Sequence, residues 1–93
     1  MNKVLIKVLI PVMDLEYELF IPVSKAVGKI KQIVFKRVLE EENISLSESI
    51  NLYASDGNML DINEVIKNTS LNNGSLVIII WHLRLRADRE KKV

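Results

Sequence analysis

The first 21 residues contain two runs in which apolar side chains recur at every second position. Residues 3–10 place Val4, Ile6, Val8 and Ile10 on one face of a strand, and residues 15–21 do the same with Leu15, Tyr17, Leu19 and Ile21. Antiparallel pairing of Ile10 with Leu15 sets Lys7 opposite Glu18 and Leu5 opposite Phe20, so one register suits both faces. The pattern predicts a β-hairpin closed by a loop at residues 11–14.

After Pro22 the apolar positions recur every three or four residues, which is typical of an amphipathic helix. Its inward stripe is Val23, Val27, Ile30, Val34 and Val38, and its opposite stripe is Lys25, Lys29, Gln32 and Lys36. We expect Ser24 to be the N-cap, Gly28 to permit close packing, and Asn43 to end the helix in a left-handed conformation. We interpret the lysine stripe and the acidic run at residues 40–42 as solvent-exposed surface.

The second half of the chain predicts two more strands. A third strand spans residues 50–54, and a turn at 55–58 follows it. Asp61 and Glu64 have the spacing of a capping box for a short helix that ends near Asn68. A turn at 72–74 leads into a final strand at 76–82, in which we expect Leu76, Ile78 and Ile80 to face the main helix and Val77, Ile79 and Trp81 to point away from it.

This order of elements predicts an α+β roll, in which a four- to five-stranded mixed sheet packs on one main helix. The helix connects the hairpin to the later strands, so the first and last strands become parallel neighbours. A chain of 93 residues has room for one domain. We expect that domain to span residues 1–82, and a basic C-terminal tail at 83–93 to be flexible.

The composition disfavours most catalytic chemistry. The chain has 13 Lys and Arg, 12 Asp and Glu, one His and no Cys. It therefore lacks disulfides, thiolates and cysteine metal sites, and the lone His82 cannot form a histidine cluster. Asp56 and Asp61 have the residue type for cation binding but are better explained as turn formers. We predict a non-catalytic domain without a metal or cofactor, and the net charge of +1 disfavours a nucleic-acid partner.

No segment resembles a membrane-spanning helix or a signal peptide. The longest apolar run, residues 76–81, is far shorter than the ~20 residues that a spanning helix needs. Lys3 and Lys7 interrupt the apolar stretch at the N-terminus. We therefore expect a cytoplasmic protein with no membrane insertion.

Four segments resemble those of ubiquitin-fold proteins. They are Lys3-Val4-Leu5-Ile6, Tyr17-Glu18-Leu19-Phe20-Ile21-Pro22-Val23, Ile50-Asn51-Leu52-Tyr53 and Asn73-Gly74-Ser75-Leu76. Over residues 3–82 the chain resembles the β-grasp, or ubiquitin, superfamily and, more narrowly, the YukD-like proteins of type VII secretion systems in Gram-positive bacteria. The resemblance implies a cytoplasmic accessory or regulatory subunit that docks on membrane-bound secretion proteins and has no catalytic activity.

A ubiquitin-like modifier or a sulfur carrier is one alternative, and a β-grasp adaptor unrelated to secretion is another. Conjugation and sulfur transfer both require a flexible C-terminal Gly-Gly. Here Ala87 and Asp88 follow the segment Leu83-Arg84-Leu85-Arg86, so we disfavour both activities. YukD-like proteins generally stop at or just after the last strand, so the resemblance does not say what the tail contributes.

The outward face of the sheet is the predicted site for a protein partner. Contiguous apolar surface on a small protein commonly marks an interface, and Trp and Tyr are enriched among binding hot spots. The expected residues are Leu5, Leu9, Tyr53, Val77, Ile79 and Trp81. Two alternatives stay open: this face forms a homodimer, or the tail covers it through Leu83 and Leu85.

The basic tail is the second candidate site, with Arg84, Arg86, Arg89, Lys91 and Lys92. Such a segment can touch anionic lipid beside a membrane partner and hold the protein at the inner face of the cell membrane. RNA binding would need stacking aromatic residues near these charges, and only Trp81 qualifies.

Overall fold

The predicted hairpin is present, in the predicted register, in the computed structural model of the chain, which describes residues 2–44 and 50–81. Strands β1 (Lys3–Ile10) and β2 (Leu15–Pro22) pair antiparallel, with Ile10 opposite Leu15 and Lys7 opposite Glu18. The connection is a 3-10 turn, η1 (Pro11–Met13), followed by Asp14 at φ 55°. Aspartate is one of the few residues that adopt this left-handed conformation routinely, and the turn closes on a hydrogen bond from its amide to the Pro11 carbonyl.

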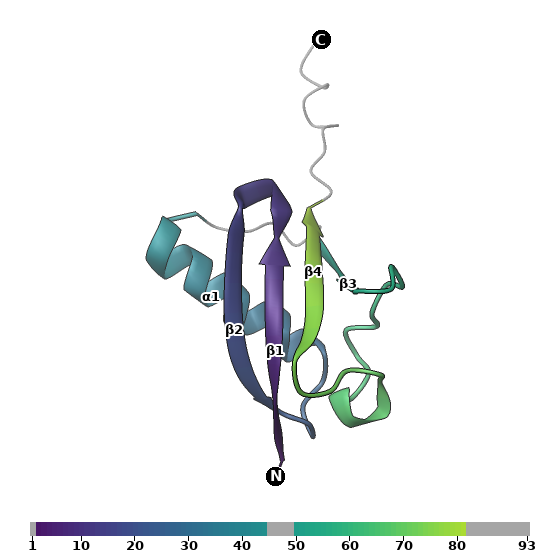
Figure 1. Cartoon of the computed structure of the whole chain (residues 1–93). Coiled ribbons are helices and arrows are strands. Elements are labelled where there is room, and N and C mark those ends of the chain that lie inside the picture. Colours follow the sequence, from purple (N-terminus) through teal and green to yellow (C-terminus); the bar gives the residue numbers. More distant parts are fainter. Residues whose placement is uncertain (1, 45–49, 82–93) are drawn as a thin grey trace.

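The other strands complete one mixed sheet. Helix α1 (Gly28–Glu42) follows the hairpin, and β3 (Ile50–Ala54), a 3-10 turn η2 (Ile66–Asn68) and β4 (Ser75–Trp81) complete the described chain. The strand order is β2-β1-β4-β3, with β1 and β4 parallel and β3 antiparallel to β4. Figure 1 shows α1 crossing one side of this sheet, while no described element covers the other side. The predicted α+β class and the parallel central pair are confirmed.

The hydrophobic core lies between the sheet and the helix. Helix α1 contributes Ile30, Val34 and Val38, which are fully buried against the inward side chains of the strands. These inward strand residues are Ile6, Val8, Ile10, Tyr17, Leu19, Ile21, Ile50, Leu52, Val77 and Ile79. The inward positions predicted for the helix are confirmed at Ile30, Val34 and Val38. Val27 is buried but is the N-cap, and Val23 lies before the helix and is only partly buried.

The predicted facing of β4 is wrong. Val77 is 0% and Ile79 is 1% exposed, so both belong to the core rather than to the outward face. The sheet register explains the reversal, because Val77 pairs with the inward Val8 and Ile79 pairs with the inward Leu52. Leu76, Ile78 and Ile80 therefore point away from the helix, and Ile80 is 38% exposed.

The helix begins four residues after the predicted N-cap, Ser24. Its N-cap is Val27, and no side chain caps it. The preceding chain is held by backbone hydrogen bonds to the segment before β4: the Ile66 amide donates to the Lys25 carbonyl at 2.8 Å, and the Lys67 amide donates to the Val23 carbonyl at 2.9 Å. The C-terminus is as predicted, since Asn43 has φ 58° and its amide bonds the Leu39 carbonyl.

The predicted capping box at residues 61–64 is also wrong. Asp61 accepts a hydrogen bond from the Asn63 amide at 2.9 Å, and its own carbonyl accepts one from the Glu64 amide. These bonds form a turn, and the 3-10 turn η2 starts later, at Ile66, without a side-chain cap. The two aspartates singled out in the sequence, Asp56 and Asp61, both form local turn hydrogen bonds, as expected of turn formers.

Candidate protein-interaction face

Outward side chains from neighbouring strands line up in rows across the sheet. One row follows the register from Leu9 in β1 to Ile78 in β4 and on to Tyr53 in β3. The next rows add Leu76 beside Lys7, and Ile80 opposite Asn51. We call the apolar members of these rows, with Leu5, the outer sheet face: Leu5, Leu9, Tyr53, Leu76, Ile78 and Ile80.

The outer sheet face is hollowed at the β3–β4 end. A shallow depression of about 250 Å³ lies beside Tyr53, Ile78 and Ile80, and the turn after β3 forms its rim. In that turn Asp56 accepts hydrogen bonds from both the backbone amide and the side-chain amide of Asn58, each at 3.0 Å. The rim is thus held by local hydrogen bonds, so the depression is formed before any partner binds.

Glycine is required in this rim. Gly57 has φ +92°, where residues with a Cβ are strained, and a Cβ placed on it would meet no atom within 4 Å. The turn therefore presents backbone rather than a side chain at the edge of the depression.

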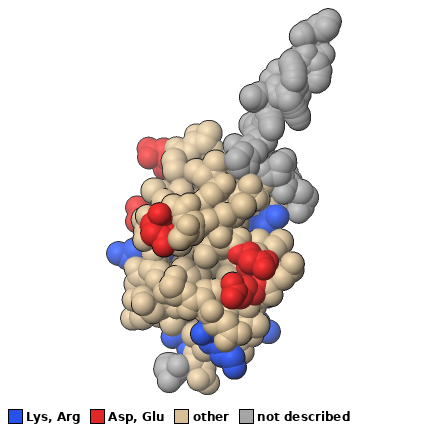
Figure 2. All heavy atoms as spheres, turned by 90° about the vertical axis from the view of Figure 1, so that its right-hand side faces the viewer, with Lys and Arg blue, Asp and Glu red and all other residues tan. Residues whose placement is uncertain are grey.

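Charged residues lie along the β1–β2 side of the outer sheet face. Lys7 faces Glu18, and Leu9 has Glu16 as its neighbour on β2. Phe20, opposite Leu5, is 68% exposed. The side that carries β3 and the connection after it shows several separate groups of acidic atoms, while basic atoms gather mainly at its lower end (Figure 2). The apolar surface is therefore bordered by Lys7, Glu16 and Glu18 on the β1–β2 side and by the turn that carries Asp56 at the β3–β4 end.

The structure places the predicted partner-binding residues in three different settings. Leu5, Leu9 and Tyr53 lie on the outer sheet face and are half-buried. Val77 and Ile79 lie in the core. The side chain of Trp81 and the whole of the predicted basic tail, with Arg84, Arg86, Arg89, Lys91 and Lys92, lie outside the described residues.

Three members of the outer sheet face were not predicted: Leu76, Ile78 and Ile80. Every residue of the last strand from Leu76 onward is apolar, so alternation alone does not say which set faces the helix. Pairing with the hairpin would have identified them. Once β1 and β4 are parallel neighbours, Leu9 and Ile78 share a row and must share a face.

Tyr17 is the one titratable group in the described chain whose pKa is clearly perturbed, and it lies on the opposite, inward face. Burial raises the pKa of its phenol, and the negative charges of Glu41 and Glu42 raise it further. The Arg37 guanidinium lies 5.5 Å from the ring centre and opposes the shift. The Tyr17 hydroxyl has no hydrogen-bond partner among the described residues. We find no chemical function for it.

The part of the chain that the structure describes holds neither a metal-binding cluster nor a membrane-spanning helix. Within residues 2–44 and 50–81, no group of three or more His, Cys, Asp and Glu side chains is placed to hold a metal ion. No helix in that part of the chain has the length and apolar character needed to cross a membrane.

Comparison with solved structures identifies the fold. No protein-family model and no curated protein matches the sequence. A ubiquitin-like domain from Arabidopsis thaliana matches with a TM-score of 0.68 and 16% identity over 90% of this chain and 82% of that one. The chain has the ubiquitin-like β-grasp fold.

Two further structural neighbours are a ubiquitin-like domain of EccD5 and a chain of an inner membrane complex. The ubiquitin-like domain of EccD5 from Mycobacterium xenopi matches with a TM-score of 0.65 and 13% identity, over 90% of this chain and 99% of that one. A chain of the ESX-5 inner membrane complex matches over all of this chain and 28% of its own length, with a TM-score of 0.64 and 13% identity. At this identity the likeness is one of fold.

Proposed function

We propose that the protein is a non-catalytic, ubiquitin-like interaction module that binds a protein partner through its outer sheet face. The observation that carries the proposal is the row Leu9–Ile78–Tyr53 with its adjoining depression, on the side of the sheet that α1 leaves uncovered. Half-buried aliphatic side chains around one aromatic ring, with a pre-formed hollow beside them, suit an apolar anchor from a partner.

We further propose that this partner is a cytoplasmic part of a membrane-bound type VII secretion component. The protein would then be a cytoplasmic accessory or regulatory subunit of the YukD-like kind, held at the inner face of the membrane through its partner. Two lines support this role: the resemblance of the sequence segments to YukD-like proteins, and the likeness of the fold to a ubiquitin-like domain of EccD5.

The test is affinity capture from membranes of the native host, with wild-type protein and a Tyr53→Ala, Ile80→Glu double variant. Both changes lie on the outer sheet face and outside the core, so the variant is expected to fold. A Glu18→Ala variant is the matched control, because Glu18 is exposed on the same side of the sheet but at the charged border.

Secretion components recovered by wild type and control, but not by the double variant, would support both parts of the proposal. Equal recovery by all three proteins would show that the partner binds elsewhere. Recovery of no secretion component by a folded wild-type protein would contradict the secretion role and leave only the fold.

A further inference from the structure

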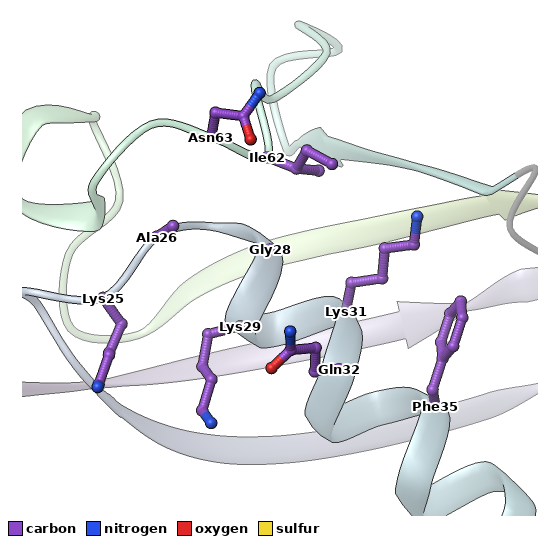
Figure 3. Close-up of a pocket in the computed structure, with 9 residues that line it drawn as sticks. All are labelled: Lys25, Ala26, Gly28, Lys29, Lys31, Gln32, Phe35, Ile62 and Asn63. Carbon is purple, nitrogen blue, oxygen red and sulfur yellow. The ribbon is translucent and has the colours of Figure 1, made fainter.

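A second concave surface lies on the other side of the molecule, against the helix. A groove of about 620 Å³ runs between the first half of α1 and the turn at residues 61–64. Figure 3 shows Lys25, just before the helix, and Lys29, in its first turn, extending away from the turn that carries Ile62 and Asn63, whereas Lys31 extends on the side of Ile62. Farther along the helix, Phe35 closes the groove.

Gly28 sets the shape of this groove. Its amide donates a hydrogen bond to the Ile62 carbonyl at 2.9 Å, and a Cβ on it would lie 3.1 Å from that oxygen. The neighbouring amide of Val27 donates to the Glu64 carbonyl at 2.9 Å. Backbone bonds thus occupy these amides at the helix start, so the charge of the groove comes from lysine side chains.

The groove is cationic with apolar ends. Within residues 2–44 and 50–81, neither Lys25 nor Lys29 forms an ion pair, and no acidic residue lines the groove. Lys31 lies over the Phe35 ring, with its ammonium 5.6 Å from the ring centre. Ile62 is 41% exposed. An occupant that fits this surface carries negative charge beside an aliphatic side chain.

The C-terminal end of the same helix combines negative charge with an exposed aliphatic side chain. Leu39 is 50% exposed, and the next three residues, Glu40, Glu41 and Glu42, are exposed as well. The exposed side of the helix also carries a stripe spaced four, three, four and three residues apart: Gly28, Gln32, Phe35, Leu39 and Glu42. This spacing averages 3.5 residues, which is the repeat of two helices packed along each other.

We propose that two copies of the chain associate through α1 in antiparallel orientation, with the acidic end of each helix in the lysine groove of the other. Alignment of the two helices about Phe35 sets Leu39 of one copy opposite Lys31 of the second, and Glu42 opposite Gly28. Residues 40–42 then lie opposite residues 28–30, with Lys29 among them and Lys25 just before them, and the two-fold axis repeats the same contact at the other end. Each interface therefore contains two equivalent contacts, and in each of them the acidic run and Leu39 of one copy lie against the lysine groove of the other.

The interface is small, so the dimer is weak and exchanges rapidly. Helix α1 has 15 residues and is about 22 Å long. An interface along one such helix is near or below the about 1,000 Å² that separates stable from transient association. The charge pairs are near the surface and are weakened by salt. We expect a micromolar dissociation constant at low salt.

The test is sedimentation equilibrium of the full chain up to about 1 mM protein at low and at high salt, a range that detects transient complexes. One variant carries Lys25→Glu and Lys29→Glu, and a second carries Glu41→Lys and Glu42→Lys. The matched control carries Lys3→Glu and Lys67→Glu, which change the net charge equally at exposed positions outside helix α1 and outside the groove. Circular dichroism verifies that each variant folds.

The expected result is a salt-sensitive dimer whose dissociation constant rises at least about tenfold in either charge-reversed variant, because like charges then face each other. An equimolar mixture of the two variants restores association, and the control associates like wild type. A monomer at every concentration, a dimer unaffected by both reversals, or a mixture that does not associate would each overturn the proposal. Loss of the dimer in Tyr53→Ala, Ile80→Glu alone would instead place self-association on the outer sheet face.

Discussion

Truncation of two neighbouring isoleucines to alanine tests the facing of β4. Ile79 is 1% exposed and packs in the core, whereas Ile78 lies on the outer sheet face and is half-buried. The two positions are adjacent in one central strand, so both substitutions lose the same β-propensity, which spans about 1 kcal/mol. The difference between the two losses of unfolding free energy therefore reports how deeply each side chain is buried.

The magnitudes follow from the packing. Replacement of a fully buried isoleucine by alanine costs about 2–5 kcal/mol. The fully buried Leu52, opposite Ile79, and Val77, on the same face of β4, leave little room for collapse, so we expect about 3–4 kcal/mol for Ile79→Ala. Ile78→Ala loses only part of the transfer free energy and leaves no closed cavity, so we expect about 1–2 kcal/mol. A domain of this length has about 5–14 kcal/mol of stability in total, so both variants should fold.

The assay is urea and thermal denaturation followed by far-ultraviolet circular dichroism. A difference of about 2 kcal/mol corresponds to a melting temperature that is about 8–16 °C lower for Ile79→Ala than for Ile78→Ala. Equal losses, or a larger loss at Ile78, would refute the assignment of Ile79 to the core and return it to the partner-binding face.

Three further substitutions test other parts of the structure. Gly28→Val should lower stability by about 1–3 kcal/mol, because its side chain collides with the Ile62 carbonyl; an unchanged urea midpoint would contradict this close approach. Gly74→Ala should cost about 1–2 kcal/mol, because Gly74 has φ +92°, and this too is measured by urea denaturation. Tyr17→Phe should be neutral or slightly stabilising at pH 7, since the hydroxyl it removes has no partner among the described residues. Because the pKa of Tyr17 is raised in the folded protein, the wild type should lose stability as pH rises above about 10 and through the folded pKa. The Tyr17→Phe variant should lack this part of the loss. Parallel curves of stability against pH for the two proteins would contradict the burial of the phenol.

The local sequence pattern predicted both the hairpin and its register, because two independent constraints require the same register. The apolar alternation and the pairing of Lys7 with Glu18 both require the same register, and a slip of one residue would break both. Asn43 was predictable for a similar reason, since asparagine tolerates the left-handed conformation that ends a helix.

Long-range pairing decided the features that the sequence alone did not predict. Ser24 is a good N-cap by local rules, but it lies in a turn that is closed by a bond from the Lys25 amide to the Pro22 carbonyl. Backbone bonds from Ile66 and Lys67 also hold the chain there, and the helix begins only at Gly28. In the same way, the neighbours Val8 and Leu52 decided which side of an all-apolar strand faces the core. The candidate site was therefore half predicted: its members on β1 and β3 were found, and those on β4 were not.

The two proposed surfaces lie on opposite sides of the sheet, and this has a consequence for binding. Helix α1 covers one side, so association of two copies through α1 leaves both outer sheet faces exposed and directed away from each other. Such a dimer can bind two copies of a partner at once. Once one site is occupied, the second binding step becomes intramolecular, and a weak dimer then strengthens attachment to a complex that contains several partner copies. A charge-reversed variant that cannot dimerise should therefore keep its affinity for an isolated partner domain but dissociate faster from a membrane that displays many.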